Sequence, residues 1–149
     1  MTTVYDVPPN TLVDAVAGEL KINEKIEQPE WAAYVKTGVN KEMPPLNSEW
    51  WYVRCASLLR RLYVDGPVGV SRLRTYYGGK YRKTTAGAHF AKGSGSVIRI
   101  ALQQLEAAGY VKKVRNGRQI TPVGQSFMDN IAHQVKAEVQ KSIPELERY

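Results

Sequence analysis

The stretch SEWWYVRCASLLRRLY, from Ser48 to Tyr63, predicts the helix around which the rest of the chain packs. At about 100° per residue, its apolar side chains share one side of a helical wheel: Trp51, Cys55, Leu58, Leu59 and Leu62, with Tyr52, Ala56 and Tyr63 beside them. More than half of the circumference is therefore apolar, which indicates a central helix that contacts several others. We expect Ser48 to cap its start and Asp65-Gly66-Pro67 to end it, so that the helix covers about 48–64.

The other side of this helix is a polar stripe of Trp50, Arg54, Ser57 and Arg61, with Arg60 next to it. Such a stripe suits a platform for phosphates and bases, because guanidinium groups pair with phosphate oxygens and aromatic faces stack on bases. It is equally typical of a tryptophan that covers the edge of the core while arginines point into water. The pattern alone leaves both interpretations open.

Helical patterns lie on both sides of the central helix. Before it, a helix follows Pro8 and Pro9, with Asn10 or Thr11 as its cap, and a short helix follows Pro29. After it, a helix begins at Ser94 or Ser96 and stops at Gly109. Thr121 is expected to cap the last helix, whose predicted buried stripe is Val123, Phe127, Ile131, Val135 and Val139.

Between the last two helices, Tyr110 to Thr121 predicts a β-hairpin around Asn116-Gly117, a dipeptide favoured in two-residue type I′ turns. After the central helix, the chain is predicted to form a short helix at 70–77, a glycine-rich loop, a helix, a hairpin and a last helix. This is the order of elements in a winged helix-turn-helix. The sequence therefore predicts one mainly helical, winged-helix-like domain, 1–149. Its landmarks are the central helix, about 48–64, and one short β-hairpin, about 110–121.

The formal net charge of +7 has a defined location. The window from Gly66 to Leu105 contains no acidic residue and seven basic ones, which equal the whole excess: Arg72, Arg74, Lys80, Arg82, Lys83, Lys92 and Arg99. A basic excess confined to one segment is typical of a site for a polyanion such as a nucleic acid. A solvated loop kept for solubility is the alternative.

The middle of this window is the stretch YYGGKYRKTTAGAHFAKGSGS, Tyr76 to Ser96. Its glycines allow close approach of the backbone to a ligand, and Tyr76, Tyr77, Tyr81 and Phe90 can stack on unpaired bases. Its glycine-serine end enters a helix, whose N–H groups and dipole attract anions. We expect the stretch to be mobile alone and to become ordered on RNA.

Patterns for other functions are weak. His89 and His133 are far apart, the single Cys55 lies on the apolar side of its helix, and no spacing resembles a zinc site. Gly79-Lys80 is followed by Tyr81 where a phosphate-binding P-loop has Ser or Thr. No apolar run approaches the roughly 20 residues of a membrane span, and the N-terminus does not resemble a signal peptide. We therefore expect a cytoplasmic protein without catalytic residues, metal, cofactor or disulfide.

Several segments of the chain, matched in the same order, resemble a known family, small-subunit ribosomal protein nineteen of the archaeal and eukaryotic type. They are PEWAAYVKTGVNKEMPP, WWYVRCASLLRRLYVDGPVGV, YYGGKYRK, HFAKGSGSVIR, LEAAGYVKK, GRQITPVGQ and DNIA, and they extend over nearly the whole chain. The resemblance implies a winged-helix-like, non-enzymatic component of the small-subunit head that binds ribosomal RNA. In eukaryotes, the family is needed for maturation of the small-subunit RNA precursor.

Resemblance and charge together give the expected RNA-binding residues: Trp50, Arg54, Arg60, Arg61, Arg72, Arg74, Tyr77, Lys80, Tyr81, Arg82, Lys83, His89, Lys92, Arg99, Arg115 and Arg118. The expected partners are ribosomal RNA and neighbouring small-subunit proteins, with no membrane, and the free protein is expected to be a monomer in the cytoplasm.

Two other functions fit parts of the pattern. In a winged-helix DNA-binding regulator, Arg99 and Gln103 would point into the major groove, and Arg115 and Arg118 would flank it. A protein-interaction module would instead expose an apolar patch and bind with little dependence on salt.

Overall fold

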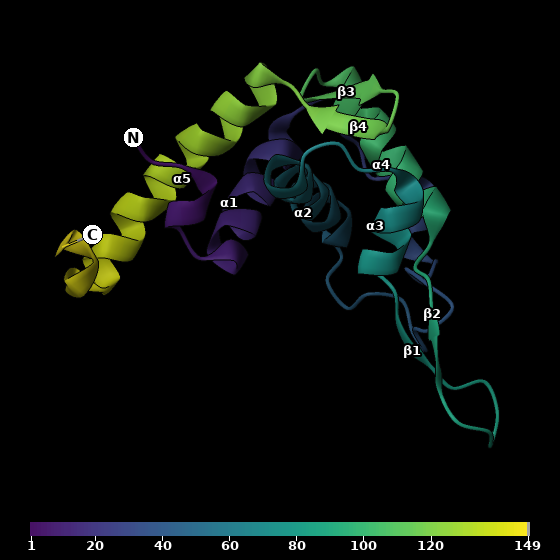
Figure 1. Ribbon diagram of the computed structural model, residues 1–149. Coiled ribbons are helices and arrows are strands. Elements are labelled where there is room, and N and C mark those ends of the chain that lie inside the picture. Colours follow the sequence, from purple (N-terminus) through teal and green to yellow (C-terminus); the bar gives the residue numbers. More distant parts are fainter. Residues whose placement is uncertain (149) are drawn as a thin grey trace.

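The computed structural model describes residues 1–148, and its elements surround one hydrophobic core (Figure 1). The α-helices are α1 (Pro9–Ile22), α2 (Trp50–Asp65), α3 (Val70–Tyr76), α4 (Gly95–Ala107) and α5 (Pro122–Ser142). Two antiparallel hairpins are formed by β1 (Gly79–Tyr81) with β2 (His89–Ala91) and by β3 (Val111–Val114) with β4 (Gly117–Ile120). Short 3-10 helices cover Val4–Asp6, Glu30–Ala33 and Pro144–Arg148. The predicted class, mainly helical and winged-helix-like, is confirmed.

Helix α2 is the central helix, as the sequence predicts. Most of its expected core face is fully buried: Trp51, Cys55, Ala56, Leu58, Leu59 and Leu62 are each 0% exposed, while Tyr52 and Tyr63 are half-buried. It packs against α1, α4 and α5. The Trp51 ring meets the edge of Trp31 with centroids 5.5 Å apart, and its indole N–H donates to Gln104 Oε1 on α4 at 2.9 Å. This one side chain therefore joins three segments of the fold.

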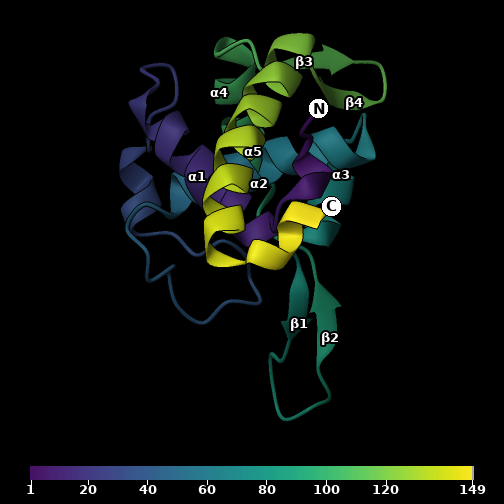
Figure 2. The ribbon, with the colours of Figure 1, turned by 90° about the vertical axis from the view of Figure 1, so that its left-hand side faces the viewer.

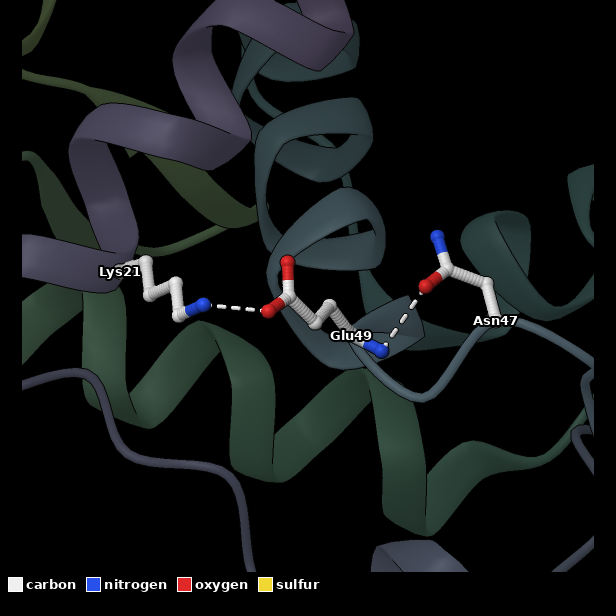
Figure 3. A network of polar contacts seen from close by, with 3 residues as sticks. All are labelled: Lys21, Asn47 and Glu49. Atoms are coloured by element: carbon white, nitrogen blue, oxygen red, sulfur yellow. Dashed lines mark hydrogen bonds and ion pairs between the residues drawn. The ribbon is translucent and has the colours of Figure 1, made fainter.

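The start of α2 differs from the prediction, because Ser48 is not its cap. The first helical residue is Trp50, and the preceding turn is held by Asn47, whose side-chain oxygen accepts a hydrogen bond from the Glu49 N–H at 2.9 Å (Figure 3). The Glu49 carboxylate forms an ion pair with Lys21 from the last turn of α1. An Asn side chain that bonds the backbone two residues later is a common alternative to a helix cap.

Two other helical predictions need correction. Helix α1 begins at Pro9, two or three residues earlier than a cap at Asn10 or Thr11 implies, and neither of these residues caps it. The helix expected after Pro29 is only the 3-10 turn Glu30–Ala33.

The later helix ends agree with the prediction. The Ser94 hydroxyl accepts a hydrogen bond from the Val97 N–H at the start of α4, and Gly109 follows its end with φ +84°. At the start of α5, the Thr121 hydroxyl accepts from the Gly124 N–H. Side-chain oxygens at these positions satisfy N–H groups that have no partner within the helix.

The buried stripe of α5 is displaced from the predicted one. Val123 is 63% exposed, and the core side is formed by Gly124, Met128, Ile131, Ala132 and Val135. Gly124 makes this rotation possible, because a Cβ atom there would lie 2.4 Å from the Tyr110 carbonyl oxygen. Phe127 stays partly buried and stacks on Tyr110, with ring centroids 4.5 Å apart.

Strands β3 and β4 form the wing. Val114 pairs with Gly117, so the two-residue turn consists of Arg115 and Asn116, one residue earlier than predicted. No residue other than glycine has a positive φ within residues 1–148, and the expected type I′ turn is therefore wrong. An isolated β-bridge joins β4 to Val68, whose N–H and C=O each pair with Arg118 at 3.0 Å. These bonds join the wing to the segment between α2 and α3.

The close approach of Val68 to the wing requires a glycine at 117. Gly117 has φ +130°, and a Cβ atom there would lie 2.4 Å from the Val68 carbonyl oxygen. We expect Gly117→Ala to lower the free energy of unfolding by about 3 kcal/mol, because strained backbone and a steric clash add together. Urea denaturation followed by circular dichroism measures this loss. Gly87→Ala is the matched control, since nothing lies within 4 Å of its added Cβ, and an equal loss in both variants would contradict the proposed contact.

The second hairpin lies inside the glycine-rich stretch for which the sequence predicts a loop, so the described residues form two hairpins where one was expected. Gly79 pairs with Ala91, Lys80 with Phe90 and Tyr81 with His89, and residues 82–88 connect the strands. Both ribbon views show this hairpin, hereafter the arm (residues 78–92), projecting from the body beyond α3 and α4 (Figures 1 and 2). The wing lies at the opposite end of α4 in both views.

Candidate nucleic-acid interface

The arm exposes a cluster of basic side chains. Lys80, Arg82, Lys83, His89 and Lys92 are all exposed, and we call them the arm surface. None of them belongs to an ion pair formed within residues 1–148. Because no carboxylate of the described residues is paired with them, their charges are available to a polyanion.

Aromatic side chains accompany these charges. Phe90 is 58% exposed and lies directly opposite Lys80 on one face of the hairpin, whereas Tyr81 is half-buried and faces His89 on the other. Each face of the arm thus combines a ring with a nitrogen-bearing side chain. Such a combination suits stacking on unpaired bases next to phosphate contacts.

The root of the arm is fixed to the body by a short set of hydrogen bonds. Arg74, on α3, donates from Nε to the Gly93 carbonyl at 3.0 Å and accepts from the Gly93 N–H at 2.9 Å through its own carbonyl. The Ser94 N–H donates to the Thr37 carbonyl at 2.9 Å. Arg74, which the sequence suggests as an RNA contact, therefore forms a structural bond here, and the Ser94 N–H at the start of α4 already has a partner.

Two further basic residues lie beside the arm. Arg72 is exposed on α3, and Arg99 is exposed in the first half of α4, which begins directly after the arm. Six of the seven basic residues in the Gly66–Leu105 window are therefore exposed, all but Arg74. The structure brings the charge excess of the sequence to α3, α4 and the projecting arm, which lie together on the right-hand side of Figure 1.

The polar stripe of α2 is arranged differently from the expectation, because Trp50 does not belong to an exposed line. Trp50 is only 7% exposed, and its indole N–H donates to the Ala32 carbonyl at 3.0 Å. Its ring packs edge-on against Trp51, with centroids 5.6 Å apart. Of the two interpretations that the pattern left open for this tryptophan, cover of the core edge is correct.

The arginines of α2 face a groove, and we call Arg54, Arg60 and Arg61 the arginine row. The groove has a volume of about 1000 Å³ and runs between the arginine row, the start of α1 and the loop at 41–47. Arg60 is half-buried there, and its Nε has no hydrogen-bond partner within residues 1–148. A buried guanidinium N–H without an acceptor suits an anionic oxygen from a binding partner.

Two tyrosines from the end of α3 lie over the arginine row. The Arg54 guanidinium carbon is 4.2 Å from the centre of the Tyr77 ring, and that of Arg61 is 4.1 Å from the centre of the Tyr76 ring. The Tyr77 hydroxyl and the Ser57 hydroxyl share a hydrogen bond of 2.6 Å. Arg61 also forms an ion pair with Asp65, one turn further along α2. Two cations of the arginine row, Arg54 and Arg61, are thus stacked on rings, and Arg61 is also paired with a carboxylate.

The environment of Arg54 and Tyr77 shifts both pKa values. Burial lowers the pKa of Arg54, although the neighbouring Tyr77 opposes this effect. Burial raises the pKa of Tyr77, while its hydrogen bond with Ser57 and the charge of Arg54 act in the opposite direction. Because arginine remains protonated in proteins, the pair at neutral pH is a cation stacked on a neutral phenol.

At the wing, the two predicted arginines have different surroundings. Arg115 is exposed in the turn. Arg118 points back to α4, where its Nε lies 2.6 Å from a carboxylate oxygen of Glu106. This ion pair could not be predicted from the sequence, because its members are on different elements and no spacing rule connects them.

The described residues show no arrangement suited to other chemistry. Within residues 1–148, no three His, Cys, Asp or Glu side chains gather as a possible metal site. Cys55 is completely buried, and burial raises the pKa of its thiol to about 12, which makes the reactive thiolate scarce. Across the same residues, no helix combines the length and the apolar character that crossing a bilayer requires.

The position of Trp50 leads to a direct expectation. Trp50→Phe keeps a buried ring but removes the hydrogen bond to Ala32, so the free energy of unfolding should fall by about 1–2 kcal/mol. Affinity for small-subunit ribosomal RNA should change less than about twofold, because an indole that is only 7% exposed offers little surface for stacking on a base. Denaturation and filter binding measure the two quantities. Weaker RNA binding at unchanged stability would instead place Trp50 at the RNA surface.

Comparison with known proteins finds relatives that align with the full length of this chain. The family model described as "Ribosomal protein S19e" matches residues 3–138. A protein of Haloarcula marismortui named "Small ribosomal subunit protein eS19" is 47% identical, with 100% of this chain and 99% of that protein aligned. The protein of the same name from Thermoplasma volcanium is 42% identical over 100% of this chain and 99% of its own length. "Small ribosomal subunit protein eS19G" of Ascaris suum is 49% identical over 91% of this chain and 93% of its own length. The chain belongs to the ribosomal protein S19e family.

Proposed function

We propose that this protein is a structural constituent of the small ribosomal subunit in the cytoplasm, that it binds ribosomal RNA, and that it takes part in assembly of the subunit and maturation of its RNA. The family is one of structural, non-enzymatic ribosomal proteins. The relatives named above are small-subunit proteins, and they align with this chain over nearly their whole lengths. This supports the same role for this chain, with residues 1–149 forming a single domain. The finer part of the proposal, contact with RNA, rests on the surface described above.

The observation that supports RNA binding best is the location of the charge excess. The whole net charge of +7 corresponds to the Gly66–Leu105 window, and six of its seven basic residues are exposed on α3, α4 and the arm. We assign RNA contact to the arm surface, Arg72, Arg99 and the arginine row, with Tyr81 and Phe90 as stacking residues and Arg115 as a contact from the wing. Trp50 and Arg118 are left out because their polar groups have partners within the protein.

The arm also argues against the alternative of a DNA-binding regulator. In DNA-binding helix-turn-helix proteins, a turn of three or four residues joins the two helices, and the N-terminal residues of the second helix reach the base edges. Here the arm takes the place of that turn and projects beyond the start of α4. A duplex that approached the N-terminus of α4 would meet the arm before the helix.

Binding measured on two nucleic acids at several salt concentrations separates the alternatives. We expect transcribed small-subunit ribosomal RNA to bind more tightly than duplex DNA of equal length, with affinity falling steeply between about 50 and 200 mM salt. Preference for duplex DNA with dependence on its sequence would favour the regulator. Affinity that is weak and insensitive to salt would favour a protein-interaction module.

A further inference from the structure

The contacts between α3 and α2 point to a role for two tyrosines that have no charge themselves. We propose that Tyr76 and Tyr77 are positioning residues, which hold the guanidinium groups of Arg61 and Arg54 in place for phosphate contact and join the arginine row to the root of the arm. This inference rests on the proposed RNA-binding function and deepens it, because it says how two separate basic surfaces become one binding site.

The geometry of the stacks supports positioning. Arginine side chains have many rotamers in water, and each loses that freedom when it binds. A ring 4.2 Å from the guanidinium carbon of Arg54, and another 4.1 Å from that of Arg61, restrict this freedom before RNA arrives. A planar guanidinium that stacks on a ring keeps its N–H groups at the edge of the stack, where they can still donate to phosphate oxygens.

The two stacks are also connected to each other and to the central helix. The Tyr76 and Tyr77 rings meet edge to face with centroids 4.9 Å apart, and the Tyr77 hydroxyl bonds Ser57 on α2. Together with Arg54 and Arg61, these residues line the groove beside Arg60. The pair of tyrosines therefore fixes where the arginine row stands relative to the end of α3.

The same tyrosines begin the arm. Gly78 follows Tyr77 directly, and a Cβ atom at Gly78 would lie 2.4 Å from the Ala91 carbonyl oxygen and 2.8 Å from the Phe90 ring. Tyr77 also lies against Gly93 on the returning side of the arm, where an added Cβ would be 3.0 Å from the Tyr77 carbonyl oxygen. The chain enters and leaves the arm at this point, so the stacks on α2 set the direction in which the arm surface is presented.

Double-mutant cycles test whether each tyrosine acts through its arginine. In filter binding to transcribed small-subunit ribosomal RNA, we expect Tyr77→Leu to weaken affinity about fivefold in the wild-type background, the size of a partly exposed cation–π contact. The same change should have no effect when Arg54→Ala is already present, because there is then nothing to position. Tyr77→Phe keeps the ring and should bind like the wild type.

The Tyr76 and Arg61 pair gives an independent cycle with less risk to the fold. Tyr76 is 50% exposed, so Tyr76→Leu should leave the unfolding midpoint unchanged and still weaken binding about threefold, only when Arg61 is present. Tyr34→Leu, at a tyrosine that is 81% exposed and outside the groove, is the matched control and should bind like the wild type. If Tyr77→Leu does not fold, this second cycle decides the question.

The outcomes distinguish this inference from the proposed function. Additive losses, in which Tyr76→Leu weakens binding equally with and without Arg61, would mean that the tyrosines contact RNA themselves or support the fold, and the positioning role would be wrong while RNA binding stands. A Tyr77→Phe variant as weak as Tyr77→Leu would also overturn the positioning role. If neither Arg54→Ala nor Arg61→Ala weakens binding, these two arginines do not contact RNA. The positioning role of the tyrosines is then wrong, and so is the RNA contact assigned to these arginines under the proposed function.

Discussion

Replacing Lys80, Arg82 and Lys83 together with glutamine is expected to weaken binding to small-subunit ribosomal RNA by about two orders of magnitude near 0.1 M salt. The three side chains are exposed on the arm and form no ion pair within residues 1–148. Each phosphate contact that is lost removes the counterion release that accompanied it. The slope of log affinity against log salt should therefore become shallower by about 2 to 3.

The matched control for the arm variant removes three charges from elsewhere. Lys25, Lys36 and Lys141 are exposed and lie outside the Gly66–Leu105 window. Changing them to glutamine gives the same net charge, but affinity and salt slope should stay close to those of the wild type. Equal losses in the two triple variants would show that net charge, and not the arm, governs binding.

The largest effect on stability is expected from Trp51→Ala. Trp51 is 0% exposed, and replacing a buried tryptophan with alanine leaves a large cavity, which costs about 3–5 kcal/mol. The change also leaves Gln104 Oε1 without the indole donor, although Gln104 still donates to the Glu27 carbonyl at 2.8 Å. Since domains have only about 5–15 kcal/mol of stability, a substantial fraction of the variant should be unfolded under mild conditions.

Urea denaturation monitored by circular dichroism measures this loss directly. Trp51→Phe fills most of the cavity and should lose clearly less, while Tyr34→Ala, at an exposed position, should stay within about 0.5 kcal/mol of the wild type. A Trp51→Ala variant that loses under about 1 kcal/mol would contradict the central place of α2 in the core.

Features with a strong local signal could be predicted from the sequence. The apolar side of α2 covers more than half of its helical wheel, so its burial follows from the periodicity of the apolar residues alone. Ser94 and Thr121 cap helices because their side chains satisfy nearby backbone N–H groups. The location of the charge excess is likewise a property of the chain itself. These predictions needed no knowledge of distant contacts.

The features that were missed depend on partners far away in the sequence. Trp50 is covered because the Ala32 carbonyl, 18 residues earlier, accepts its indole N–H. Arg118 points back to the body because Glu106, on α4, pairs with it. The stripe of α5 rotates toward Gly124 because a glycine allows the Tyr110 carbonyl to approach. The arm has strands of only three residues among glycines, which gives no alternating pattern for a sequence method to detect.

The assignment to the small subunit is tested most directly by sedimentation of native cell extract through a density gradient, with the protein followed by an antibody. We expect it to travel with small ribosomal subunits at moderate salt and to leave them at high salt, as contacts between phosphates and basic side chains require. The arm variant with Lys80, Arg82 and Lys83 changed to glutamine should leave at lower salt than the wild type. Finding the wild-type protein only in free fractions, or bound to duplex DNA, would contradict the account.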